Sequence, residues 1–182
     1  MKTDLSKFDN SWYKPGANVI KRFLWYFVNA LVFKSSLVPV SRFKVLVLRC
    51  FGATVGKKVN IKPSVNIKYP WKLSIGDYAW IGENVWIDNL AQITIGAHCC
   101  ISQGALLLCG NHNFKLATFE LMTGEIVLED GVWIGAHAIV CTNVICGSHA
   151  VLTVGSVATR PLEPFAVYQG NPAVKIKERV IS

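Results

Sequence analysis

The sequence predicts a mainly β protein: a parallel β-helix of about five coils, preceded by a helical arm and followed by a short tail. An aliphatic residue recurs every six positions from residue 55 to residue 158, and each insertion into this repeat follows a third unit. A period of six kept over fifteen units is typical of stacked three-sided coils. We therefore expect an arm at 1–54, a β-helix at 55–163 with an active-site loop at 108–127, and a tail at 164–182.

The inward positions of the repeat follow from strand geometry. Side chains alternate faces along a strand, so the repeated residue i and the residue i+4 should both face the core. Small or apolar residues occupy i+4, from Val59 to Ser156. Glycine often follows at i+1, where we expect it to allow a positive φ at the corner. The repeated column is Val55, Ile61, Ile67, Ile75, Ile81, Ile87, Ile95, Ile101, Leu107, Leu128, Ile134, Val140, Cys146, Leu152 and Ala158.

The insertions indicate where a functional site should lie. Two are short, because Ile67 to Ile75 and Ile87 to Ile95 each span eight residues, and the third is the long break at 108–127. Stacked in register, all three should emerge from one vertical edge. Loops held by a rigid scaffold often carry function, so we expect the site at this edge.

The N-terminal arm is basic and apolar. Residues 1–54 carry nine Lys or Arg against two Asp, whereas residues 55–159 carry six basic and seven acidic side chains. The excess positive charge lies on an apolar arm, and this placement argues against nucleic-acid binding. Residues 18–51 read as helices, and their longest charge-free apolar stretch, 23–33, is shorter than the roughly 20 residues that a membrane span needs. Two interpretations stay open: these helices lie on a membrane surface, or they cap the first coil.

The six cysteines do not predict a disulfide framework. They lack a C-x-x-C spacing, and no secretion signal precedes them. We expect reduced thiols in a cytoplasmic protein. The basic, apolar arm adds the expectation of peripheral contact with the inner membrane surface.

The repeat resembles the left-handed β-helix acyltransferases over about residues 50–180. The segments 69–77, 86–89, 110–113 and 170–173 resemble the colanic-acid-biosynthesis acetyltransferase type, and galactoside and maltose acetyltransferases are more distant siblings. The resemblance implies the left hand of the helix and a homotrimer with active sites between neighbouring prisms. It also implies acetyl transfer from acetyl-CoA to a sugar hydroxyl of an exopolysaccharide or envelope glycan precursor, with no metal.

Acetyl transfer to a hydroxyl needs a base, and a neutral histidine suits this task. His98, His137 and His149 occupy regular outward positions, i+3 of their units, so His112 in the long loop is the predicted catalytic base. We expect direct transfer rather than an acyl-enzyme on Cys109. A backbone N–H within 133–136 is the predicted oxyanion donor.

The remaining predicted site residues bind the two substrates. Asp88, Asn89 and Asn111 are predicted to bind the acceptor, and corner capping is the alternative for the first two. For acetyl-CoA the resemblance implies Trp133, Gly135, Ala136, Gly155, Thr159, Arg160 and Lys177.

Other functions also fit this fold. The acceptor could be a small free sugar, or the protein could be a non-catalytic scaffold. A zinc enzyme of the γ-carbonic anhydrase type is disfavoured because the four histidines are not clustered in the sequence. The spacing of Trp80 and Trp86 predicts an aromatic ladder, with both side chains facing outward one coil apart. Such a ladder would pack against a sugar or within the trimer interface.

Overall fold

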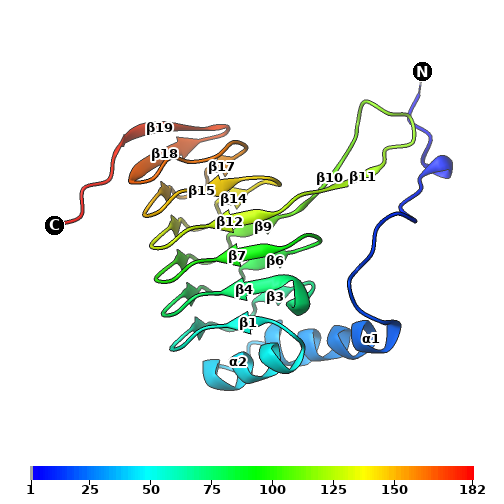
Figure 1. Ribbon diagram of the computed structural model, residues 1–182, viewed down its shortest axis with the longest axis horizontal. Coiled ribbons are helices and arrows are strands. Elements are labelled where there is room, and N and C mark those ends of the chain that lie inside the picture. The colour runs from blue at the N-terminus through cyan, green and yellow to red at the C-terminus, as the bar shows by residue number, and fades with distance from the viewer. Residues whose placement is uncertain (1) are drawn as a thin grey trace.

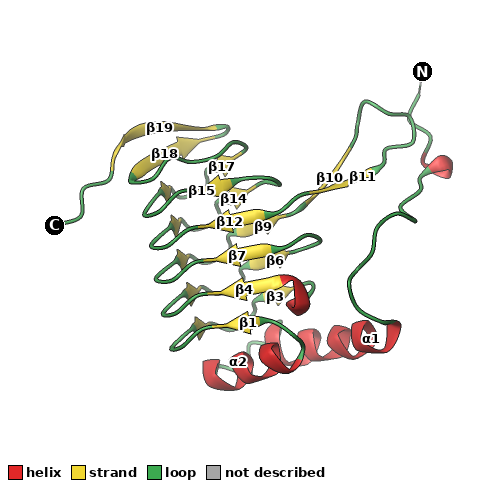
Figure 2. Cartoon of the chain, in the orientation of Figure 1, coloured by secondary structure: helices red, strands yellow, loops and turns green. Residues whose placement is uncertain are grey.

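The computed structural model describes residues 2–182 as a three-sided parallel β-helix with helices across one end (Figures 1 and 2). The first face holds β1 (Thr54–Val55), β4 (Leu73–Ile75), β7 (Ile93–Ile95), β12 (Ile126–Leu128) and β15 (Ile145–Cys146). The second holds β2 (Asn60–Ile61), β5 (Trp80–Ile81), β8 (Cys100–Ile101), β13 (Trp133–Ile134), β16 (Val151–Leu152), β18 (Ala166–Gly170) and β19 (Ala173–Glu178). The third holds β3 (Asn66–Ile67), β6 (Trp86–Asp88), β9 (Leu106–Leu108), β14 (Ile139–Val140) and β17 (Val157–Ala158).

The coil count agrees with the prediction. Each of the five coils takes one strand from every face, and a partial sixth turn follows, in which Leu162 bridges to Cys146 and β18 pairs with β16. The predicted mainly β fold, a left-handed parallel β-helix, is confirmed.

The inward columns of the repeat are buried as predicted. Every residue of the repeated column is at most 8% exposed, and most have no exposed surface. In the i+4 column only Ala91, beside an insertion, stays partly exposed. These two columns fill the interior of the prism with aliphatic side chains, so the hydrophobic effect fixes both the register and the stacking of the coils.

The corners differ from the prediction. Positive φ angles occur at i+3 of the regular units rather than at the i+1 glycines. The histidines at this position have φ of 57° (His98), 55° (His137) and 59° (His149). His98 stacks on Tyr78 of the coil below, with ring centroids 5.0 Å apart, so it belongs to a column of corner side chains.

The i+1 glycines are required for another reason, which is the close approach of consecutive coils. A Cβ at Gly76 would lie 2.5 Å from the backbone nitrogen of Ala97, and a Cβ at Gly135 would lie 2.6 Å from that of Val154. Real Cβ atoms do not approach backbone so closely, so these glycines let one coil lie against the next.

The aromatic-ladder prediction for Trp80 and Trp86 is wrong. Six residues make one side of a coil, so Trp80 in β5 and Trp86 in β6 lie in the same coil on different faces. Both side chains face outward, at 44% and 45% exposure. On the second face Trp80 and Trp133 are separated by Cys100 of the coil between them.

The helices cover the open end of the first coil. They comprise α1 (Val19–Val28), the π-helical η2 (Asn29–Phe33) and α2 (Ser41–Cys50). Trp25 is buried and donates its indole N–H to the Ile67 carbonyl at 2.9 Å, while Phe33 and Leu48 are fully buried. Lys44 is also fully buried, with Nζ 2.8 Å from the Lys62 carbonyl oxygen, and burial lowers its pKa. Capping is therefore one role of these helices.

Two 3-10 turns and a C-terminal strand pair lie outside the coils and the capping helices. The 3-10 turns η1 (Leu5–Lys7) and η3 (Pro70–Lys72) lie in the N-terminal segment and in the first insertion. The C-terminal tail forms an antiparallel pair, β18 with β19, that covers the last coil. Among the described residues, no helix is both long enough and apolar enough to cross a membrane.

Candidate active site

All three insertions emerge from the edge between the third and first faces. They follow β3, β6 and β9, which are successive strands of the third face. The longest contains the antiparallel hairpin of β10 (Gly110–His112) and β11 (Leu121–Thr123), which extends away from the coils (Figure 1). Asp88 pairs in register with Leu108, so the second insertion lies directly beneath the base of this hairpin. The insertions thus form one continuous edge.

His112 is the last residue of β10, and its ring is held in a defined orientation. It stacks on Phe119 with ring centroids 4.4 Å apart and an interplanar angle of 7°. Nδ1 lies 2.9 Å from the Phe119 carbonyl oxygen. A carbonyl can only accept a hydrogen bond, so the neutral ring carries its proton on Nδ1 and leaves Nε2 with a free lone pair. This is the tautomer that a base acting through Nε2 requires.

The His112 side chain lines a cleft of about 750 Å³. The cleft runs along the edge of the β-helix and includes residues from all three insertions and from the N-terminal segment. Its lining residues are Phe8, Asn10, Ser11, Tyr13, Pro15, Arg22, Lys68, Tyr69, Asp88, Leu90, Leu108, Gly110, Asn111, His112 and Leu121.

One wall of the cleft comes from residues 4–15, here called the N-terminal strap, which runs from the hairpin down to α1 (Figure 1). The backbone N–H of Asp4 donates to the Ala117 carbonyl at 2.8 Å, and the Pro15 carbonyl accepts from the Trp71 indole at 2.7 Å. Phe8 lies 5.9 Å from the His112 ring. Sequence reasoning did not place the strap at the site. The feature of the sequence that could have indicated this role is the presence of aromatic residues in an otherwise polar segment.

Tyr13 anchors the strap at the second insertion. Its hydroxyl donates to the Leu90 carbonyl at 2.8 Å, and Lys72 Nζ donates to the same carbonyl at 2.6 Å. Burial raises the pKa of Tyr13 and lowers that of Lys72. The phenol therefore stays protonated and remains a donor at neutral pH.

Of the predicted acceptor residues, Asn89 has a structural role. Its side chain has no exposed surface, accepts from the Tyr69 N–H at 2.9 Å, and donates to the carbonyls of Tyr69 and Lys72. These bonds connect the second insertion to the first. The Asn89 side chain therefore caps a corner, which was the alternative interpretation of this residue. We therefore leave Asn89 out of the acceptor site.

Asp88 and Asn111 both line the cleft with His112. Asp88 is 6% exposed, and its Oδ1 forms an ion pair with Lys68 Nζ at 2.9 Å without an aligned hydrogen bond. Asn111 is exposed, and its Oδ1 accepts from the His112 backbone N–H at 2.8 Å. Both keep polar atoms that could accept or donate bonds to a sugar.

The residues predicted for CoA fall into three groups. Trp133 and Lys177 line a second cleft of about 710 Å³ on the second face. Gly135, Ala136 and Gly155 lie at the corner after that face, where the Gly155 N–H donates to the Ala136 carbonyl at 2.9 Å. Thr159 and Arg160 are exposed and follow β17. The second cleft shares no lining residue with the His112 cleft.

The backbone at 133–136 offers a free donor at Ala136. The N–H groups of Trp133 and Gly135 donate to carbonyls of the next coil, those of Ala150 and Leu152. Within residues 2–182 the N–H of Ala136 has no hydrogen-bond acceptor. A corner amide fixed by the coil on both sides can stabilise an oxyanion without reorganising.

The structure gives less support to Cys109 as a nucleophile and to a metal site. Cys109 is fully buried, and burial raises its pKa to about 11, so its sulfur is a protonated thiol at neutral pH. In the described part of the chain all six cysteines are free, and no three His, Cys, Asp or Glu side chains lie together as a metal site. His98, His137 and His149 occupy corners instead.

Comparisons with known proteins give a consistent result. The chain is 41% identical over 177 residues, 97% of both chains, to the "Putative colanic acid biosynthesis acetyltransferase WcaF" of Escherichia coli (strain K12). It is 29% identical over 129 residues to the galactoside O-acetyltransferase of the same strain, covering 69% of this chain and 64% of that one. No family model matches the chain.

Two solved structures share the fold. A hexapeptide-repeat acetyltransferase of Vibrio cholerae O1 biovar eltor, complexed with acetyl-CoA, gives a TM-score of 0.81 at 22% identity, covering 91% of this chain and 92% of that one. A galactoside acetyltransferase in complex with coenzyme A gives 0.77 at 24% identity, covering 87% and 80%.

Proposed function

Because the chain belongs to the WcaF-like hexapeptide-repeat acetyltransferases and uses acetyl-CoA, we propose that it acetylates a sugar hydroxyl of an exopolysaccharide or envelope glycan precursor, with His112 as general base. The observation that carries the proposal is the hydrogen bond between His112 Nδ1 and the Phe119 carbonyl. It leaves Nε2 available as a base in a cleft that also holds Asp88 and Asn111.

The proposed reaction is a direct transfer. His112 Nε2 takes the proton of the acceptor hydroxyl as its oxygen attacks the thioester carbonyl. The new C–O bond forms, the C–S bond breaks, and the CoA sulfur leaves with the proton that the imidazolium returns. The Ala136 N–H is the donor we propose for the oxyanion, and Asp88 and Asn111 hold neighbouring sugar hydroxyls.

We also propose that the working unit is a homotrimer. In one chain the His112 cleft lies on the edge that bears the hairpin, whereas Trp133 and Lys177 line a cleft on another face, together with other residues of the C-terminal tail. The hairpin and the C-terminal tail lie on opposite sides of the prism (Figure 1). Acetyl-CoA bound at the second cleft would be separated from the base of the same chain. Neighbouring prisms packed around a threefold axis would bring the His112 of one chain to the CoA residues of the next.

Acetyl transfer itself tests the proposal. Purified protein given acetyl-CoA and oligosaccharides from an acidic exopolysaccharide should release CoA thiol and yield a product heavier by one acetyl group. Small free sugars serve as the second acceptor set, and faster transfer to them would favour the small-sugar alternative. No thiol release with either set would favour the scaffold alternative.

We further propose that the protein works in the cytoplasm at the inner membrane surface, through the side of the helices that faces away from the coils. This outer helix face is apolar: Leu31 is 69% exposed and Ile20 is 72% exposed. Lys21, Arg22, Lys34, Arg42 and Arg49 belong to the same helical segment. Apolar side chains with basic neighbours suit an anionic interface, because each basic residue near such a surface adds about 1 kcal/mol.

Vesicle co-sedimentation tests the membrane proposal. The full-length protein should pellet with vesicles containing anionic lipid at low salt, and less at high salt. The double variant Phe27→Glu and Leu31→Glu should stay in the supernatant, because both exposed side chains would lose contact with the lipid. Val154→Glu, at an exposed corner of the fifth coil, is the matched control and should pellet as the wild type does. Wild-type protein that stays in solution under all conditions would rule the proposal out.

A further inference from the structure

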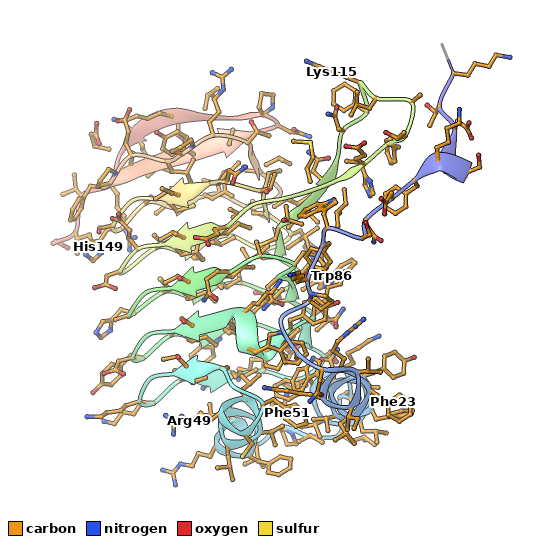
Figure 3. The ribbon with its side chains drawn as sticks, turned by 45° about the vertical axis from the view of Figure 1, so that its right-hand side comes forward. Phe23, Arg49, Phe51, Trp86, Lys115 and His149 are labelled. Carbon is orange, nitrogen blue, oxygen red and sulfur yellow. The ribbon has the colours of Figure 1, made fainter. Side chains whose placement is uncertain are left out.

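The hairpin loop that carries Phe119 lies outside the stacked coils. Figure 3 labels Lys115 at the tip of this loop, clear of the β-helix and on the side where the N-terminal strap runs. Neither Phe119 nor Phe114, another phenylalanine of the loop, belongs to the buried core, since Phe119 is only partly buried and Phe114 is 75% exposed. Packing in the interior of the prism therefore does not set the conformation of Phe119.

The backbone of Phe119 lies in the left-handed region, with a φ of 52°. A bulky residue rarely adopts this conformation, which persists only where the surrounding structure holds it. Each of the other described non-glycine residues with a positive φ lies at a corner of the coils, three positions after an inward residue such as Ile95 or Leu162. The stacking of the coils explains those corners, but it does not explain Phe119.

The backbone and the side chain of Phe119 both contact His112. The Phe119 carbonyl oxygen lies 2.9 Å from Nδ1, and the phenyl ring stacks on the imidazole with centroids 4.4 Å apart and 7° between the planes. The Phe119 N–H donates to the Leu116 carbonyl at 3.1 Å and closes the turn. A hydrogen bond at one ring nitrogen restrains rotation about the Cβ–Cγ bond, and a stacked ring restrains tilt. One strained residue thus restrains the imidazole in two ways.

The N-terminal strap supports the same turn and the same ring. The Asp4 N–H donates at 2.8 Å to the carbonyl of Ala117, which lies two residues before Phe119. Phe8 of the strap lies 5.9 Å from the His112 ring, measured between centroids, which is within the range of aromatic pairs. The strap and the hairpin loop therefore hold the imidazole together, although they are far apart in the sequence.

We propose that Phe119 is a positioning residue for the base, that its left-handed backbone directs the carbonyl to His112 Nδ1, and that Phe8 braces the ring from the strap. The inference rests on the proposed function only for the reaction at Nε2. A base contributes fully only when its lone pair is aligned with the acceptor hydroxyl, and a misplacement of about 1 Å can lower the rate by roughly 10²-fold. Backbone strain of this kind is concentrated at functional sites.

Three substitutions at position 119 separate the ring from the backbone. Phe119→Tyr keeps both, and its kcat should stay near that of the wild type. Phe119→Asn removes the ring but tolerates a positive φ, so kcat should fall by up to roughly tenfold. Phe119→Val also disfavours the left-handed backbone, because valine is β-branched, and kcat should fall by roughly 10–100-fold with an unchanged KM for acetyl-CoA. Wild-type kcat in Phe119→Val would overturn the inference.

The matched control is Phe114→Val. Phe114 belongs to the same loop, but it does not line the His112 cleft, and in residues 2–182 the aromatic contacts of His112 are with Phe8 and Phe119. Phe114→Val should keep the wild-type kcat and melting temperature. A loss of turnover equal to that in Phe119→Val would show that the loop responds to any lost phenylalanine, and would overturn the assignment to Phe119.

A second pair of variants tests the strap. Phe8→Ala should lower kcat by up to roughly tenfold, the equivalent of one aromatic pair. Leu5→Ala removes an apolar side chain that is 63% exposed, only three residues earlier in the strap, and it should leave kcat unchanged. Equal losses in the two variants, or no loss in either, would overturn the bracing role of Phe8.

Nitrogen NMR of full-length protein, isotope-labelled at histidine, tests the positioning separately from catalysis. The His112 signals are those that disappear in His112→Ala. In the wild type the neutral ring should carry its proton on Nδ1, whereas Phe119→Val should give signals averaged between the two tautomers, because its carbonyl no longer faces Nδ1. Unchanged signals in Phe119→Val would overturn the inference whatever the turnover. Changed signals together with full turnover in His112→Ala would support the positioning and contradict only the proposed base.

Discussion

Replacing His112 with alanine should lower the turnover of acetyl transfer by about 10²–10⁴-fold, the usual contribution of a general base. The ring lines the cleft, and its Nδ1 is held by the Phe119 carbonyl at 2.9 Å, so Nε2 is the nitrogen that would accept the hydroxyl proton. The substitution removes contacts with Phe119 in the hairpin and with Phe8 in the strap, and none with the buried core of the coils. Circular dichroism and the melting temperature should therefore stay near those of the wild type.

The control for this experiment is His98→Asn. His98 is a corner residue with a φ of 57°, a conformation that asparagine tolerates, and it lines neither the His112 cleft nor the Trp133 cleft. Its replacement should leave turnover unchanged. If purified His112→Ala keeps more than about a tenth of wild-type turnover, another group is the base.

Ile134→Asp should destabilise the β-helix by several kcal/mol, a large part of the roughly 5–15 kcal/mol that keeps a domain folded. Ile134 has no exposed surface and lies in register between Ile101 and Leu152, which are also fully buried. An aspartate there would have apolar neighbours above and below. We expect little soluble protein, or a melting temperature lowered by many degrees.

The matched substitution is Val154→Asp, which places the same carboxylate at a corner residue that is 70% exposed. It should melt close to the wild-type temperature, because the charge stays in water. Ile134→Asp that remained soluble and melted with Val154→Asp would contradict the inward assignment of the six-residue repeat.

The repeat made the fold predictable because its period and its geometry are coupled. Each repeated apolar residue from Val55 to Ala158 marks one short strand, and each insertion marks the same edge of the β-helix. The register of a strand and the face to which it belongs can therefore be obtained by counting residues along the repeat. The corners were less predictable. Glycine at i+1 indicated a positive φ, but the requirement at that position is close contact between coils, which depends on the coil above.

The site was predictable where it depended on the repeat. His112 is distinguished in the sequence because it interrupts the hexad pattern, and the structure places it with Asp88 and Asn111 in one cleft. The strap was not predictable, because Phe8 and Tyr13 reach the cleft through contacts with residues about 77 to 104 positions away. The capping role of Asn89 depends on backbone groups of the preceding insertion, which no local pattern encodes.

The most direct test of the central claim is the mass spectrum of the envelope glycan made by cells that carry the wild-type gene, the His112→Ala gene or neither. We expect one acetyl group per repeating unit to be present with the wild type and to be absent or strongly reduced in the other two. Equal protein levels in the first two strains are the necessary control. Identical acetylation in all three strains would contradict the assignment of this chain as a glycan acetyltransferase that depends on His112.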